Sequence, residues 1–187
     1  GNSPGHGPAA ADGRGGVTNT VRRPSMSSGL VPATFTIPLL LETSRVRIRP
    51  LTICDVVKDY DAVMTSVEHL KGVFGPDSGW PSPAMTLEQD LIDLGWHQKE
   101  FQRGSSFAYT VMSPDETRCL GCLYIDPSPR PDYDAMIVAW VRQSEAATGL
   151  DQHLLETIRN WLRTSWPFRN PGFPGRDVSW EKWNAGC

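Results

Sequence analysis

Hydrophobic and polar residues alternate in four short stretches of the chain, and this pattern predicts four β-strands. The stretches cover residues 46–49, 107–111, 120–124 and 136–140. Alternation with a period of two places the apolar side chains on one face of a sheet. Only short turn-forming segments separate the last three stretches, so we expect them to form an antiparallel meander.

Apolar residues spaced by three and four predict three helices between and after these strands. The first covers residues 56–70. The second begins after Thr86, which forms a capping-box pattern with the residue three positions on, and Gly95 is expected to weaken it or end its first part. The third covers residues 150–163. The core face of the second helix is expected to consist of Leu87, Leu91 and Leu94.

The resulting order is strand, helix, helix, three strands and a helix. It predicts an α/β fold with a mixed, largely antiparallel central sheet flanked by helices. Residues 1–33 are rich in Gly, Pro, Ala and Ser and form a predicted low-complexity extension. Residues 34–187 form the predicted folded domain. Within it, residues 33–37 alternate in a way that fits pairing at a sheet edge, which motivates the prediction of a homodimer.

Charge and composition exclude several partners. The net charge of −3 gives no basic field for nucleic acid or an anionic membrane surface, and no apolar run approaches the length of a membrane span. The Arg22-Arg23 pair is followed by an apolar stretch too short for an export signal. The four cysteines show no disulfide pattern, so we expect a cytoplasmic protein.

Cys119 and Cys122 form a lone CxxC pair. A zinc site would need a second ligand pair, so no metal site is expected. A redox site would need a helix after the first cysteine. On one continuous strand, a spacing of three sends the two side chains to opposite faces. We therefore expect two small strand residues.

The strand that ends near Val141 leads through a short turn containing Gly149 into the third helix. The first turn of a helix presents backbone N–H groups without intrahelical partners, and the helix dipole favours anions there. This turn is therefore a candidate phosphate-binding site.

Three segments resemble the GNAT acetyltransferases of the ribosomal-protein-acetyltransferase-like branch. They are LETSRVRIRPLTICDVVKDYDAV at residues 41–63, GCLYIDP at residues 121–127 and WVRQSEAATGLDQHLL at residues 140–155. The resemblance implies a GNAT fold whose C-terminal half is shortened, since only 24 residues follow Arg163. It implies acetyl-CoA as cofactor and acyl transfer to a small-molecule or peptide amine. The alternative is a GNAT-derived binding or assembly module without catalysis.

The cofactor signature of that family is matched at Val141 and Gly149, but Ala146 replaces its usual Gln or Arg and Asp151 its usual Gly or Ala. At about 4 Å, two like charges repel by about 1 kcal/mol in water and about 4 kcal/mol at an effective dielectric of about 20. Asp151 also suits the first turn of a helix. The implied cofactor-binding residues are Trp140, Val141, Ala146, Ala147, Thr148, Gly149, Leu150 and Asp151.

Direct attack of an amine on a thioester needs a base that removes the ammonium proton. Glu145 lies in the turn beside the implied cofactor, and the ordinary pKa of a histidine suits His97 to the task. Tyr124 lies on a strand that can line the cleft. Each has a structural alternative: a solvated turn carboxylate, a packed histidine and a core tyrosine.

Overall fold

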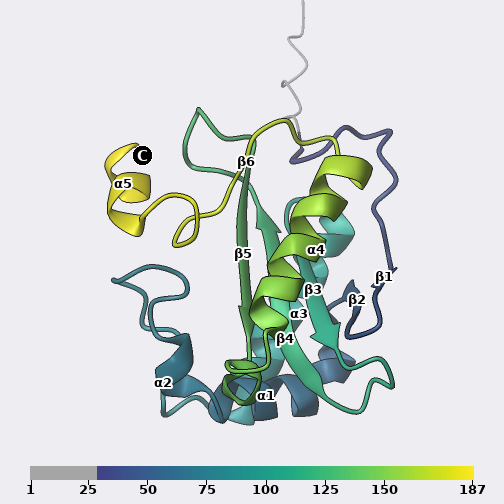
Figure 1. Cartoon of the computed structure of the whole chain (residues 1–187), viewed down its shortest axis with the longest axis vertical. Coiled ribbons are helices and arrows are strands. Elements are labelled where there is room, and N and C mark those ends of the chain that lie inside the picture. The colour runs from purple at the N-terminus through teal and green to yellow at the C-terminus, as the bar shows by residue number, and fades with distance from the viewer. Residues whose placement is uncertain (1–28) are drawn as a thin grey trace, which may run out of the picture.

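A six-stranded sheet in the order β1-β2-β3-β4-β5-β6 forms the centre of the computed structural model, which describes residues 29–187 (Figure 1). The neighbours from β1 to β5 are antiparallel, and β6 is parallel to β5. The predicted fold class is therefore confirmed. The strands are β1 (Leu41–Glu42), β2 (Arg47–Pro50), β3 (Phe107–Met112), β4 (Cys119–Asp126), β5 (Ala135–Val141) and β6 (Pro171–Gly172).

Helices cover both faces of this sheet. One face carries α4, which crosses the strands in front in Figure 1, and the other carries α1 and α3. The α-helices are α1 (Val56–Met64), α2 (Val67–Leu70), α3 (Leu87–Arg103), α4 (Leu150–Ser165) and α5 (Trp180–Ala185). Two 3-10 turns, η1 (Ile53–Asp55) and η2 (Gln143–Glu145), precede α1 and α4. No helix within residues 29–187 has the length and apolar character needed to cross a membrane.

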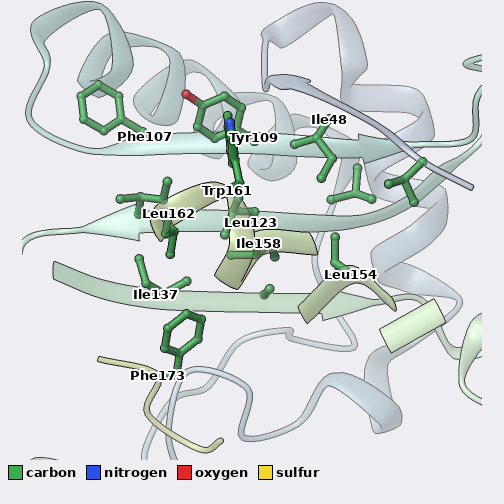
Figure 2. Close-up of a cluster of buried hydrophobic side chains, with 14 of the residues drawn as sticks. Ile48, Phe107, Tyr109, Leu123, Ile137, Leu154, Ile158, Trp161, Leu162 and Phe173 are labelled. Atoms are coloured by element: carbon green, nitrogen blue, oxygen red, sulfur yellow. The ribbon is translucent and has the colours of Figure 1, made fainter. Parts of the chain in front are cut away.

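The α4 face holds the larger hydrophobic core, shown in Figure 2. Leu154, Ile158 and Trp161 of α4 pack there on the side chains of β3, β4 and β5 that point toward α4. The segment before β1 covers the same core, since Phe35 lies 5.4 Å from the Trp166 ring. The Tyr109 hydroxyl donates to the carbonyl of Pro38 at 2.7 Å.

The predicted edge strand at residues 33–37 is wrong. Phe35 N–H donates to the carbonyl of Pro32, which closes a turn, and the segment continues as irregular chain into β1. The apolar side chains of this segment pack on the hydrophobic core of the same chain. Most of the predicted 1–33 extension lies outside the described residues, although Leu30 and Val31 pack on that core as well.

The helices differ from the prediction in three ways. The first is interrupted at Thr65, whose hydroxyl donates back to the Asp61 carbonyl at 2.6 Å. The second continues through Gly95, which packs close to Ile53 of η1. Its predicted core face is also wrong in part, because Leu87 and Leu91 are exposed and Leu94 is buried.

The two CxxC cysteines point to the same face of the sheet, which corrects the prediction of opposite faces. The β3–β4 register shifts so that Val111 faces Gly121 while Met112 faces Cys119, and the extra residue between them restores the side-chain direction. Both thiols lie in the core on the α1 and α3 side. Burial raises the pKa of Cys119 to about 12 and that of Cys122 well above its ordinary value, so neither forms a thiolate readily.

Candidate functional site

An open strand edge forms the first part of the site. β6 pairs with β5 only at Ala135 and Met136, and beyond these residues the two segments separate. A cleft of about 360 Å³ lies along the free edge of β5, between this strand and the loop after α2. In Figure 1, α2 and the segment leading to α5 lie on the same side of β5, and the cleft lining includes residues of both. The lining residues include His69, Val73, Trp140, Val141, Asp151 and Arg176.

The backbone of β5 presents hydrogen-bonding groups to this cleft. The carbonyl of Ala139 accepts from Nη2 of Arg176 at 3.1 Å, and the carbonyl of Val141 accepts from Nε2 of His69 at 3.1 Å. In a strand the N–H and C=O of one residue point to the same side. The N–H groups of Ala139 and Val141 therefore also face the cleft.

The N-terminus of α4 forms the second part of the site. Gly149 has a φ of 76°, in the left-handed region, and a Cβ placed there would meet nothing within 4 Å. Within residues 29–187, the N–H groups of Gly149, Asp151 and Gln152 have no hydrogen-bond acceptor. The N–H of Ala147 also has no acceptor among these residues, so the predicted cradle from Ala147 to Asp151 has three free donors and Gln152 adds a fourth, which makes this helix N-terminus a suitable place for a phosphate group.

Arg176 neutralises Asp151 at this cradle, a contact that no pattern along the chain predicts. Its guanidinium binds the carboxylate through two bonds of 2.6 and 2.8 Å. The ion pair holds the pKa of Asp151 below its ordinary value and raises that of Arg176. The carboxylate that stands where the GNAT signature has Gly or Ala is therefore compensated by a cation from the segment after β6.

Further cations surround the turn before α4. Arg45 donates to the Thr148 carbonyl at 3.1 Å, and Arg118 donates to the Ser144 hydroxyl at 3.2 Å. Arg118 is exposed and Arg45 is half-buried, and both guanidinium groups have hydrogen-bonding capacity left. Arg118 and Arg176 are paired with Glu145 and Asp151, so Arg45 is the cation of this group without a carboxylate partner within residues 29–187, and each guanidinium can still donate to an anion.

The predicted cofactor-binding residues do gather at this cleft, with different parts facing it. The residues that line it are Trp140, Val141, Ala146 and Asp151. Ala147 and Gly149 form the turn itself. The Thr148 hydroxyl is used within the turn, where it donates to Glu145 and accepts from Leu150 N–H. The Leu150 side chain is buried in the core.

The predicted bases do not meet at one place. Glu145 is held beside the turn by the Thr148 hydroxyl and lies 3.9 Å from Arg118. His97 and Tyr124 lie together on the opposite side of the sheet, with ring centroids 5.3 Å apart, in a second cavity. His69 is the histidine that lines the cleft. A lone histidine in a short helix carries no sequence signal for such a position.

The second cavity contains an unexpected pair of carboxylates, Asp59 of α1 and Asp90 of α3. Burial and mutual repulsion raise the pKa of Asp59 well above its ordinary value, and burial raises that of Asp90 to about 6. Each aspartate interrupts an otherwise helical pattern of apolar residues, which is the signal that could have found it. Among residues 29–187 no group of three or more potential ligands has the arrangement of a metal site.

Comparisons with known proteins agree with this architecture. The chain is similar to the ribosomal-protein-S5-alanine acetyltransferase from Vibrio fischeri, with a TM-score of 0.59 and 14% identity over 79% of this chain and 81% of that one. RimL, a ribosomal L7/L12 α-N-protein acetyltransferase solved with coenzyme A, gives a TM-score of 0.54 and 16% identity over 67% and 70%.

The microcin C7 self-immunity acetyltransferase MccE, solved with acetyl-CoA and AMP, gives a TM-score of 0.50 and 10% identity over 64% of this chain and 63% of that one. No protein-family model matches the sequence, and the search of curated proteins finds no relative. The likeness is therefore one of structure, and the structural neighbours of this chain are GNAT-family acetyltransferases, ribosomal-protein acetyltransferases among them, whose fold it shares.

Proposed function

We propose that this protein is an N-acyltransferase that uses acetyl-CoA. The observation that carries the proposal is the meeting of two features at one cleft: the free edge of β5 and the unpaired N–H groups of Gly149, Asp151 and Gln152. The structural neighbours RimL and MccE were solved with coenzyme A and acetyl-CoA, respectively, which supports the same ligand here.

The residues of the cleft fit such a ligand in separate ways. The N–H groups at the start of α4 would hold the pyrophosphate. The carbonyls of Ala139 and Val141 already accept from Arg176 and His69, so the Ala139 N–H would be the group of β5 that bonds a carbonyl of the pantetheine arm. The ligand would supply an acyl thioester. The Val141 N–H is the donor placed to stabilise negative charge on the thioester oxygen.

His69 is our first candidate for the base. Because its Nε2 donates to the Val141 carbonyl, Nδ1 is left as the acceptor of that ring. In the proposed reaction the amine nitrogen forms the new bond to the acyl carbon, the carbon–sulfur bond breaks, and the amine proton passes to Nδ1. The thiolate leaves and takes a proton from solvent. Glu145 and His97 remain candidates for the same role, and Tyr124, whose pKa burial raises, is a candidate proton donor.

Isothermal calorimetry with acetyl-CoA tests the binding step, and thiol release in the presence of a panel of amines tests the transfer. We expect His69→Gln to retain acetyl-CoA binding and to lose turnover by about 10²- to 10⁴-fold, the usual effect of removing a general base. His153→Gln is a matched control, because His153 bonds Thr43 on the far side of the turn. Equal turnover in His69→Gln and the unsubstituted protein would transfer the role to Glu145 or His97.

The alternative function is a binding or assembly module without catalysis. One observation favours it: Arg176 already occupies the Ala139 carbonyl and Asp151, so the cleft is partly closed by the chain itself. The absence of calorimetric heat and of thermal stabilisation at millimolar acetyl-CoA would favour the module and reject the enzyme. The cytoplasmic location and the homodimer remain predictions, and light scattering of the full chain tests the second.

A further inference from the structure

The cavity between α1, α3 and the sheet combines acidic and aromatic walls. It has a volume of about 290 Å³. Asp59 comes from α1, Asp90 and Asp93 come from α3, and Tyr124 comes from β4, while Trp80 closes the cavity from the loop before α3. Leu51, Phe74, Leu94 and His97 complete the lining.

Asp59 and Asp90 are buried without a cationic partner. Their exposed fractions are 4% and 3%, and Oδ2 of Asp90 has no hydrogen-bond partner. Oδ1 of Asp59 receives one long contact, from the Cys122 thiol at 4.0 Å. Within residues 29–187 neither carboxylate forms an ion pair with Lys or Arg. A buried carboxylate in this state is costly unless something neutralises it.

The same helix region shows how this protein treats another buried aspartate. Asp55 is exposed by 5%, and Arg49 binds both of its oxygens at 2.8 and 3.0 Å. Asp59 lies one helical turn further along and lacks such a partner. The contrast indicates that the negative charge of the Asp59–Asp90 pair is neutralised by a proton shared between the two groups or by a bound cation that is not part of the protein.

The aromatic walls select the kind of cation. The Phe74 ring lies 5.1 Å from both Trp80 and Tyr124, in edge-to-face contacts that fix all three rings around the cavity. Aromatic faces attract organic ammonium groups, and carboxylates beside them add charge. A metal ion would need at least three suitably placed ligands, an arrangement not found within residues 29–187.

The cavity adjoins the cleft through one contact. Trp140 of β5 lines the cleft, and its indole N–H donates to the Tyr124 hydroxyl at 3.3 Å. Trp80 packs on Trp140 with ring centroids 5.9 Å apart. A molecule seated against Trp80 and Tyr124 therefore lies next to the strand that carries Val141.

We propose that this cavity is the acceptor site and that Asp59 and Asp90 bind the ammonium group of a primary amine carried on an aromatic or apolar carbon chain. The inference rests on the proposed acyl transfer, because it assigns the amine that the reaction consumes. The ammonium group would leave one proton on the carboxylate pair and react as the neutral amine, whose second proton passes to His69 as the bond to the acyl carbon forms. Two carboxylates that share one proton carry one negative charge, which matches one ammonium group, and the exposed carboxylate of Asp93 in the same lining adds to the attraction for a cation. Burial raises the pKa of both groups, and the charge of Asp90 raises that of Asp59 further, while the hydrogen bond from Asp59 lowers that of Asp90, as expected for a pair in which Asp59 holds the shared proton.

Calorimetric titration of the full chain with phenethylammonium chloride at pH 7.5 tests the proposal. Its neutral isostere, 2-phenylethanol, fills the same volume without the charge. We expect the ammonium compound to bind at least tenfold more tightly than the alcohol. Asp90→Asn and Asp59→Asn should each weaken ammonium binding at least tenfold, while the matched variant Glu88→Gln, on the exposed face of α3, should not change it.

Equal affinity for the amine and the alcohol, absence of amine binding, or equal amine binding by Asp90→Asn and Glu88→Gln would each overturn the proposal. If Asp90→Asn fails to fold by circular dichroism, Trp80→Leu gives the second measurement and should weaken amine binding while leaving the carboxylates in place. Acetyl-CoA is titrated into the same proteins. Amine binding without acetyl-CoA binding would reject the enzyme but keep the cation site, and the reverse result would reject only the cation site.

Discussion

Replacement of Asp151 by Asn should tighten the binding of acetyl-CoA. The carboxylate lies at the first turn of α4, beside the N–H groups of Gly149, Asp151 and Gln152, which are free to bind a phosphate. Two charges about 4 Å apart interact by about 1 kcal/mol in water and about 4 kcal/mol at an effective dielectric of about 20. The Asp151 side chain is 40% exposed, so the value near that of water applies. Removal of the repulsion then increases affinity about fivefold, since about 1.4 kcal/mol corresponds to a factor of ten.

Replacement of Arg176, the partner of Asp151 in the ion pair, should change the affinity for acetyl-CoA in the opposite direction. Arg176→Gln leaves the Asp151 carboxylate without its cation beside the pyrophosphate, so affinity should fall by about fivefold or more. Asp151→Asn in turn releases the Arg176 guanidinium, which can then bind a phosphate oxygen. The cost to stability is small in both variants, about 0–1 kcal/mol for a partly exposed pair.

Isothermal calorimetry with acetyl-CoA at low and high salt measures both effects. Glu156→Gln removes the same charge from an exposed position of α4 and should leave the affinity unchanged. S-acetyl-pantetheine lacks the pyrophosphate, so its affinity should be indifferent to the Asp151 substitution. The gain should also shrink as salt rises. Weaker binding by Asp151→Asn would refute the electrostatic reasoning and show that Asp151 holds Arg176 in a position that the ligand needs.

Two further predictions concern stability. Burial raises the pKa of Asp90 to about 6, above its ordinary value, so the folded state binds this proton more tightly than the unfolded chain and stability falls as pH rises from about 4 through 6. Asp90→Asn should remove this loss and raise the free energy of unfolding at pH 7 by up to about 3 kcal/mol, measured by urea denaturation; a less stable variant at that pH contradicts it. A Cβ at Gly121 would lie 2.0 Å from the Trp140 carbonyl oxygen, so Gly121→Ala should cost about 1–3 kcal/mol or more and distort the cleft. Gly79→Ala, where a Cβ meets nothing within 4 Å, is its control in the same denaturation assay, and equal stability of the two variants would show that the strands separate freely.

The sequence by itself determined the elements whose cause is local. Thr86 and Gln89 exchange the two hydrogen bonds of a capping box, as their spacing predicts, and α3 begins there. Alternation predicted the strands of the meander, and Gly149 marked the turn before α4 with its positive φ. These features depend on residues within a few positions of one another, so the pattern along the chain contains them.

Only the tertiary structure decided what faces the cleft and the cavity. Arg176 reaches Asp151 across 25 residues, and His69 reaches Val141 across 72. Such pairs depend on how far β5 and β6 separate and how the loop after α2 folds back, which no local periodicity records. A single extra residue between Cys119 and Gly121 likewise turned both CxxC cysteines to one face.

The helix α3 shows the same division within one element. Helical spacing predicted that α3 forms, but the spacing of its leucines chose the wrong side, because its position against α1 and the sheet buries Asp90 and Leu94 and leaves Leu87 and Leu91 exposed. The apolar face of a helix determines its orientation only when burying that face lowers the free energy more than burying another face does. Here the neighbouring elements set the orientation, and with it the placement of a carboxylate opposite Asp59.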